Sequence, residues 1–147
     1  VLKTFGEERL APKIARGILE KMRGGELKTT IDLADICFYA YSVRHRHQRI
    51  HPATRTFQAL RIWVNQELSR LKDFLELSTA LLKEDGRLCI LSYHSLEDRM
   101  VKHTFRRAAA TGNPFEVLTK KPIVPGDEEI AINPRSRSAK LRGLRRR

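Results

Sequence analysis

The sequence predicts an α/β fold of three strands and about five helices, and two features carry this prediction. The apolar run Leu88-Cys89-Ile90-Leu91 has the length and continuity of a strand buried on both faces of a parallel sheet. Helical apolar periodicity stands on both sides of this run, in the helix–strand–helix order of α/β proteins. Turn residues at Glu84-Asp85-Gly86 separate the first helix from the strand.

The tripeptide Tyr93-His94-Ser95 follows the strand at its carboxyl end, which is where open α/β sheets bind ligands. We expect the Ser95 hydroxyl to cap the next helix, with Asp98 reaching back from three residues later. A polar, aromatic and titratable corner at this position suits an active site. On these residues alone, an ordinary strand–turn–helix corner with a surface His94 is the better interpretation.

Two amphipathic helices are predicted before residue 44. Pro12 indicates that the first begins near Ala11 or kinks there, and Gly24-Gly25 ends it. Thr29 or Thr30 caps the second helix. The apolar residues expected to face the core from these helices are Leu10, Ile14, Ile18, Met22, Ile31, Leu33, Ile36, Cys37 and Tyr39.

The segment 44–61 contains five arginines, three histidines and no acidic residue. A solvated basic loop is one interpretation. A metal site at the three histidines, His45, His47 and His51, is a weak one, because no carboxylate or cysteine accompanies them and arginines repel a cation. Contact with phosphate groups is the interpretation we favour, because arginine binds phosphate through two parallel hydrogen bonds.

The remaining elements follow in order along the chain. A single long helix is predicted from about residue 53 to 83, and a second from Ser95 to Thr111. Strands are expected at 115–119 and 139–144, with a short helix capped by Asp127 between them.

Composition narrows the class of partner. A formal charge of +12 on 147 residues favours a polyanion, with nucleic acid ahead of an anionic membrane. No apolar run approaches the roughly 20 residues of a membrane span, and the start resembles neither a signal nor a transit peptide. Cys37 and Cys89 are expected to be buried thiols in a reducing compartment. Other enzyme motifs, such as GxSxG, the Walker loop, HExxH and CxxC, are missing from the sequence.

Four stretches together resemble the RsmH/MraW-type methyltransferases. They are, in chain order, Thr4–Arg9, His51–Ile62, Asp85–Lys102 with the core Ser-Tyr-His-Ser-Leu-Glu-Asp-Arg, and Asn133–Arg142. Four matches in the same order are far more specific than any one alone. The resemblance implies transfer of a methyl group from S-adenosylmethionine to N4 of a cytidine in the decoding region of 16S ribosomal RNA.

The resemblance also implies a fold and a site. The fold is the C-terminal part of a Rossmann-like class I methyltransferase sheet, with three strands of which the last is antiparallel and central, plus part of an inserted all-helical substrate-recognition domain. Residues 1–52 would belong to the inserted domain and residues 53–147 to the methyltransferase domain. The implied catalytic residues are Tyr93, His94, Ser95 and Glu97. The implied RNA-binding residues are Arg55, Phe57, Gln58, Arg61, Asp98, Arg99, Asn133, Arg135, Arg137, Ser138 and Lys140.

The main departure from the family pattern is the glycine-rich cofactor loop, since no Gly-x-Gly occurs in these residues. We therefore expect a fragment without S-adenosylmethionine-binding residues or a metal, inactive alone, whose partner is 16S rRNA or the small ribosomal subunit. A cytoplasmic location, no membrane partner and a possible homodimer complete the expectation. The rival interpretation is a basic RNA-binding module without catalysis, because charge alone supports both.

Overall fold

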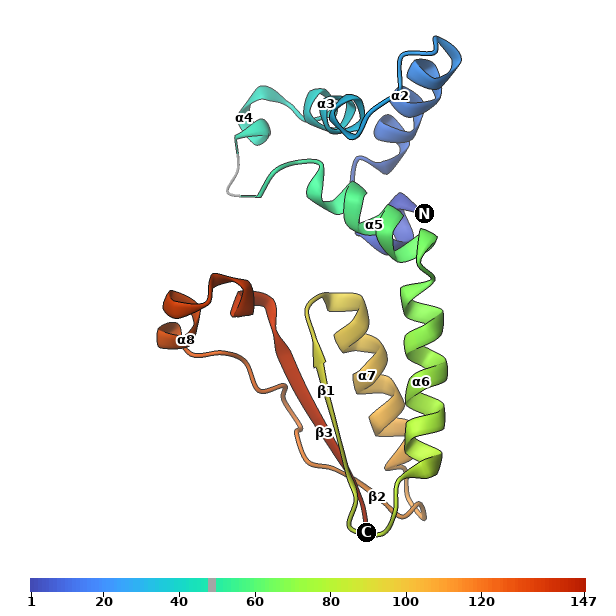
Figure 1. Cartoon of the computed structure of the whole chain (residues 1–147), viewed down its shortest axis with the longest axis vertical. Coiled ribbons are helices and arrows are strands. Elements are labelled where there is room, and N and C mark those ends of the chain that lie inside the picture. Colours follow the sequence, from blue (N-terminus) through green and yellow to red (C-terminus); the bar gives the residue numbers. More distant parts are fainter. Residues whose placement is uncertain (48–49) are drawn as a thin grey trace. The chain divides into compact units, whose positions relative to one another are not determined.

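The computed structural model describes residues 1–47 and 50–147, so Gln48 and Arg49 of the predicted basic segment lie outside the described residues. The chain forms two compact units, Val1–Glu67 (unit 1) and Leu68–Arg147 (unit 2). Figure 1 traces both units along the sequence. This boundary differs from the predicted division at residue 52; the assignment of the two parts to an inserted and a methyltransferase domain stays a prediction. Among the described residues, no helix is both long and apolar enough to span a membrane.

Unit 1 is helical. Its helices are α1 (Leu2–Gly6), α2 (Ala11–Arg23), α3 (Thr30–Ala40), α4 (Val43–Arg46) and α5 (Thr54–Val64). As predicted, Pro12 lies in the first turn of α2 and Gly24 ends that helix. Thr29 and Asp32 form the capping box of α3.

The core of unit 1 gathers side chains from four helices. Its buried apolar members are Leu2, Ala11, Ile14, Cys37, Ala40, Ala53 and Ala59. The close approach of α1 to α5 depends on Gly6, because a Cβ there would lie 2.6 Å from the carbonyl oxygen of Arg55. Three predicted core residues are wrong: Met22 of α2 is 59% exposed, and Ile31 and Tyr39 of α3 are 69% and 64% exposed. The α3 residues that face the core instead repeat at helical spacing, with Cys37 and Ala40 buried.

The long helix predicted from residue 53 to 83 is two helices. α5 ends at Val64, Gln66 adopts a left-handed backbone conformation with φ of 52°, and α6 begins at Glu67 and runs to Leu81. The prediction failed because the apolar spacing continues across the break, and neither glycine nor proline marks it. Val64, the last residue of α5, is 69% exposed.

Unit 2 contains α6, a three-stranded sheet and α7 (Ser95–Ala108), followed by α8 (Asp127–Ile132) and the 3₁₀ helix η1 (Pro134–Ser138). The strands are β1 (Arg87–Ser92), β2 (Phe115–Val117) and β3 (Lys140–Arg146), in the order β1-β3-β2. β3 pairs antiparallel with both neighbours, so the predicted central antiparallel strand is confirmed. Asp127 is the first residue of α8 rather than its cap, which is Gly126.

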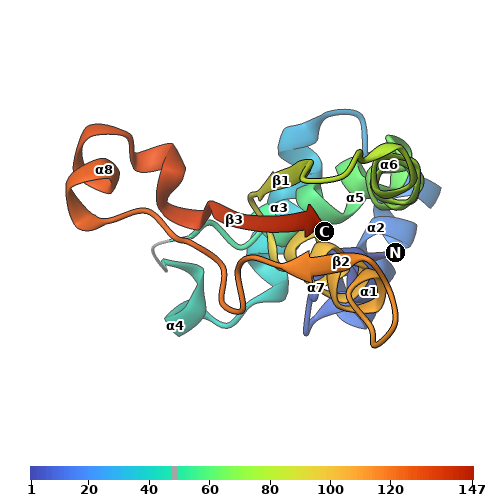
Figure 2. The same ribbon diagram turned by 90° about the horizontal axis from the view of Figure 1, so that it is seen from below.

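Helices α6 and α7 pack on one face of this sheet (Figures 1 and 2). Leu75, Val101, Phe105 and Leu144 form the buried cluster between them. The prediction that β1 is buried on both faces is wrong for this chain. Its side chains alternate, and Leu91 on the other face is 52% exposed. Cys89 is exposed for the same reason, whereas Cys37 in unit 1 is buried as predicted.

Candidate functional site

The carboxyl end of β1 is tied to the start of α7 by a capping box in which histidine takes the place of serine. His94 is the N-cap, and its Nδ1 accepts the N–H of Glu97 at 3.3 Å. Glu97 Oε2 in turn accepts the N–H groups of Tyr93 at 3.0 Å and His94 at 3.3 Å. The predicted cap, Ser95 with Asp98, is therefore wrong: Ser95 is the first residue of the helix. The box begins one residue earlier than the sequence suggested.

The capping box fixes both side chains of the corner. Because Nδ1 accepts a hydrogen bond, the neutral His94 ring carries its proton on Nε2. Nε2 is buried, lies 3.3 Å from Glu97 Oε1, and has no partner of hydrogen-bond geometry among the described residues. Burial opposes ionisation of Glu97, but the His94 ring and the two backbone N–H groups outweigh it and hold the Glu97 pKa below its usual value. Tyr93 beside them is 52% exposed, which leaves its ring available to a ligand.

A second contact joins α7 to β3. Asp98 accepts two hydrogen bonds from the Arg142 guanidinium, at 2.6 and 3.3 Å, and Lys140 Nζ lies 3.6 Å from the same carboxylate. Burial opposes ionisation of Asp98, but these two cations outweigh it and lower its pKa. Ser92 at the end of β1 also donates its hydroxyl to the Lys140 carbonyl at 3.3 Å. The candidate residues of β1, α7 and β3 therefore form one connected cluster.

The basic segment before β3 is ordered. Asn133 caps η1 by accepting the N–H of Arg135 at 3.2 Å, and the Ser136 hydroxyl donates to the Asn133 carbonyl at 2.8 Å. Arg135 and Arg137 project from this short helix and are exposed, as are Ser138 and, on α7, Arg99. Because β3 continues from η1 as the central strand, the segment is part of the fold rather than a frayed tail.

The remaining candidates lie on α5 in unit 1, and their surroundings differ. Arg55 is exposed and lines a pocket. Phe57 packs against the core of unit 1, and Gln58 is half-buried. Arg61 donates to both carboxylate oxygens of Glu67, at 2.8 and 3.1 Å, and does not line that pocket. Arg55 and Arg61 therefore have different surroundings: Arg55 lines the pocket, whereas Arg61 is paired with Glu67.

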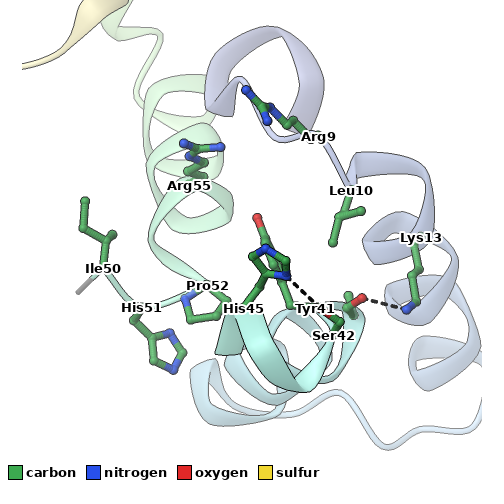
Figure 3. A pocket seen from close by; sticks show the side chains of 11 residues that line it. Arg9, Leu10, Lys13, Tyr41, Ser42, His45, Ile50, His51, Pro52 and Arg55 are labelled. Carbon is green, nitrogen blue, oxygen red and sulfur yellow. Dashed lines mark hydrogen bonds between the residues drawn. The ribbon is translucent and has the colours of Figure 1, made fainter. Parts of the chain in front are cut away.

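The pocket that Arg55 lines has a volume of about 760 Å³ and lies within unit 1 (Figure 3). We call it the unit 1 pocket. Its lining residues are Arg9, Leu10, Lys13, Ala40, Tyr41, Ser42, His45, Ile50, His51, Pro52 and Arg55. Sequence reasoning missed Arg9, Lys13 and Tyr41 as neighbours of Arg55, because they come from segments that only the tertiary fold brings together.

A glycine that cradles S-adenosylmethionine leaves room for a ligand where its Cβ would stand. Four glycines of the described residues leave no such room, because Gly6 faces α5, Gly17 faces Ile36, Gly86 faces its own turn and Gly143 faces Leu118. The expectation that this chain lacks S-adenosylmethionine-binding residues stays a prediction.

Comparison with known proteins identifies the family. The chain matches the MraW methylase family over residues 1–147. It belongs to that family. A ribosomal RNA small subunit methyltransferase H from Trichodesmium erythraeum is 55% identical over 142 residues, which cover 97% of this chain and 48% of the relative. A protein of the same name from a Sulfurihydrogenibium species is 51% identical over 146 residues, covering 99% of this chain and 50% of the relative.

The MraW family resemblance read from the four sequence stretches is thus confirmed. A third protein of that name, from a Nostoc species, is 52% identical over 138 residues and is covered to 43%. The chain spans about half the length of the curated relatives it matches.

Proposed function

We propose that this chain is the substrate-side part of a ribosomal RNA methyltransferase that transfers a methyl group from S-adenosylmethionine to N4 of a cytidine in the decoding region of 16S rRNA. One observation carries the proposal beyond family membership. The stretches Ser92–Arg99 and Asn133–Arg142, more than thirty residues apart in sequence, meet in one cluster through Asp98, Arg142 and Lys140. The same proposal includes the domain assignment, in which residues 53–147 belong to a Rossmann-like methyltransferase sheet and residues 1–52 to an inserted helical domain.

The chemistry of the substrate explains what this cluster would do. The exocyclic amine of cytosine is a poor nucleophile, because its lone pair is delocalised into the ring. A base must be turned out of the RNA and held with its amine oriented before it can react. We propose that the half-exposed Tyr93 ring stacks on the base. Glu97, ionised and held by the capping box, then accepts a hydrogen of the amine, with the His94 ring and the N–H groups of Tyr93 and His94 fixing its position. Ser95, the first residue of α7, belongs to the proposed site by family resemblance.

The proposed RNA contacts divide by chemistry. Exposed cations on η1 and α7, namely Arg135, Arg137 and Arg99, contact phosphates, together with Ser138. Asp98 is a positioning residue, because its carboxylate is engaged with Arg142 and Lys140. Asn133 positions η1 in the same way. In unit 1 we assign the phosphate contact on α5 to Arg55, with Gln58 and Arg61 as further contacts on that helix and Phe57 holding it against the core. Small-subunit rRNA in the cytoplasm is the partner that this arrangement suits.

The test of this proposal must separate the helix cap from the chemistry. An N-cap side chain lost to alanine costs about 0.5–2 kcal/mol, so His94→Ala loses a cap and an imidazole together. Asparagine is among the best N-cap residues, so His94→Asn keeps the cap and removes only the ring. We expect the full-length protein with His94→Asn to retain its melting temperature and to lose at least about 100-fold in methyl transfer to small ribosomal subunits. Full activity of the His94→Asn protein would show that His94 only caps α7 and takes no part in methyl transfer.

The same assay distinguishes this enzyme from the rival function, a non-catalytic RNA-binding module. Transfer of labelled methyl from S-adenosylmethionine is followed on small subunits, and digestion to nucleosides locates the label. Label on N4 of a cytidine is the expected result. RNA binding without any methyl transfer by the wild-type full-length protein would support a non-catalytic RNA-binding module, for which the charge of +12 is the supporting observation.

The phosphate contacts of η1 need point substitutions, because deleting residues 133–147 would remove the central strand of the sheet. Each phosphate contact in single-stranded RNA adds roughly 0.7 to the slope of log affinity against log salt. We expect Arg135→Gln and Arg137→Gln each to lower this slope by about that amount. Lys72→Gln on α6, an exposed cation outside the proposed interface, is the matched control and should leave the slope unchanged.

A further inference from the structure

The unit 1 pocket carries an excess of positive charge. Three cations line it among the described residues, Arg9, Lys13 and Arg55, and none of these described lining residues is acidic. No hydrogen bond or ion pair joins the Arg9 or Arg55 guanidinium to another described residue. Lys13 donates one hydrogen bond, to the Ala40 carbonyl at 2.6 Å. Figure 3 shows both guanidinium groups on the side of the pocket toward which the Tyr41 hydroxyl points.

The buried carboxylate of Glu8 lies next to the pocket but forms no ion pair with these cations. Glu8 is 2% exposed and is already engaged by other donors. Its carboxylate accepts the Tyr41 hydroxyl at 2.8 Å on both oxygens and the N–H of Leu10 at 2.8 Å. Burial, followed by the contact with Glu8, raises the pKa of Tyr41 to about 12, so the phenol adds no negative charge at neutral pH. The Glu8 carboxylate therefore offsets only part of the charge of the three lining cations, and the remaining positive charge favours an anion in the pocket.

Aromatic rings and a guanidinium form a platform next to the pocket. We define the platform as Phe38, Tyr39, Arg46 and His51. The Arg46 guanidinium lies 5.4 Å from the Phe38 ring centroid and 5.0 Å from that of Tyr39. The His51 ring stacks on Phe38 at 6.1 Å with an interplanar angle of 20°. Tyr39 is 64% exposed, so most of its ring is accessible to a ligand.

Two contacts make the pocket and the platform continuous. His51 lines the pocket and stacks on Phe38 of the platform. Arg46 Nε donates to the carbonyl of Tyr41, a lining residue, at 3.0 Å, and this bond holds the guanidinium over the two platform rings. The cationic pocket and the exposed aromatic platform are therefore adjacent on unit 1.

We propose that unit 1 holds a single-stranded segment of the substrate RNA, with a backbone phosphate between Arg9 and Arg55 and the neighbouring base stacked on Tyr39. Proteins that bind single-stranded nucleic acid combine a cationic groove with aromatic side chains on which bases stack. Bases within an RNA duplex are already stacked on each other and cannot use such a platform. This inference rests on the proposed function, because it names how the ribosomal RNA is held.

The phosphate contact is tested by the salt dependence of binding. The probe is a fluorescein-labelled oligouridine of about ten nucleotides, bound to the full-length protein and followed by fluorescence anisotropy. We expect Arg9→Gln and Arg55→Gln each to lower the slope of log affinity against log salt by about 0.7. Arg16→Gln removes the same charge from an exposed position of α2 outside the pocket and is the control. An equal slope change for Arg16→Gln would overturn the pocket assignment, leaving only non-specific charge.

The stacking contact has a different signature. Loss of a stacked aromatic ring weakens binding by roughly 5- to 150-fold. We expect Tyr39→Ala to weaken oligouridine binding by this factor while leaving the salt slope unchanged, and Tyr39→Trp to restore it. Trp63→Ala, which removes another exposed aromatic ring of unit 1, should have no effect. Unchanged affinity of Tyr39→Ala, with its fold verified by circular dichroism, would refute the platform.

A duplex probe completes the experiment. The wild-type protein should bind double-stranded RNA of the same length more weakly than oligouridine, and Tyr39→Ala should narrow that difference. Equal affinity for the two probes would overturn the single-strand assignment, and binding to neither would overturn the inference as a whole. A protein that methylates small subunits but whose Arg9 and Tyr39 variants bind oligouridine normally would refute this inference alone. Absence of methyl transfer, with the binding pattern intact, would refute the proposed catalysis and leave the RNA site standing.

Discussion

The first prediction concerns the buried ion pair Asp98–Arg142 in unit 2. Removing one of its two charges should lower the free energy of unfolding by an amount that the burial of the pair lets us estimate. The Arg142 side chain is 7% exposed and that of Asp98 is 13% exposed, and two hydrogen bonds join them. Breaking a buried pair from one side costs about 3–5 kcal/mol, because the remaining charge stays buried without its counter-ion. An asparagine at this position keeps one acceptor oxygen but leaves Arg142 buried without a counter-ion, so we expect Asp98→Asn to cost about 3 kcal/mol at pH 7.

The pH dependence of this cost follows from the direction of the Asp98 pKa shift. The pKa in the folded protein lies below its unfolded value of about 3.9. The pair's contribution is therefore complete above the unfolded pKa and is lost as the pH falls through the folded pKa. The asparagine side chain of the variant does not titrate. We expect the stabilities of wild type and Asp98→Asn to differ at pH 7 and to converge as the pH falls below about 4.

Hydrogen exchange measured by mass spectrometry on peptides from β1 and β3 is the appropriate assay, because it reports on unit 2 alone, whereas the single tryptophan lies in unit 1. Glu116→Gln is the matched control. Glu116 pairs with Arg147 at 3.4 Å, with both side chains largely exposed, so its loss should cost at most about 1 kcal/mol. A cost for Asp98→Asn no greater than that of Glu116→Gln would refute the reasoning from burial.

Three further substitutions or reactions test the packing. Gly6→Ala should destabilise unit 1 by about 1–3 kcal/mol in thermal unfolding, because the Arg55 carbonyl lies 2.6 Å from the new Cβ and backbone cannot easily yield. Gly126→Ala, with nothing within 4 Å of the new Cβ, should cost only what alanine loses against glycine as the N-cap of α8, about 0.5–1 kcal/mol, and a cost equal to or above that of Gly6→Ala would contradict this account. With Ellman's reagent the exposed Cys89 should react quickly; Cys37, whose pKa is raised by burial, should react only on unfolding, and equal rates would show that its burial is wrong.

Much of the fold follows from local rules. Proline near the start of α2, glycine at its end and the Thr29–Asp32 box were all readable from the sequence, since each acts within one helical turn. The strand order β1-β3-β2 was predicted as well, but from family resemblance rather than from residue patterns. The break between α5 and α6 was missed because its left-handed residue is Gln66, a type that rarely takes this conformation.

The site was harder to predict for a similar reason. Serine is a common N-cap and histidine a rare one, so propensity favoured Ser95, whereas the backbone places His94 at the cap. Asp98 was assigned to capping because its partner, Arg142, lies 44 residues away. No periodicity carries that information. The same limit applied to Tyr39: an aromatic residue on an amphipathic helix is usually in the core, and only the tertiary fold shows it exposed beside Arg46.

The four stretches that carried the family resemblance prove to be two pairs, each within one unit. In unit 1, Gly6 of the first stretch lets α1 approach Arg55 of the second so closely that a Cβ would not fit. Arg9, which follows, then lines the same pocket as Arg55. In unit 2, Asp98 of the third stretch binds Arg142 of the fourth. In both pairs of stretches, a contact that holds the fold together therefore lies close in sequence to a residue that we propose binds RNA. Residues that lock two segments together also set the distance between the cations that those segments carry, because packed backbone does not deform easily. Substitutions at Gly6 or Asp98 are therefore expected to impair RNA binding without removing any cation from the proposed interface.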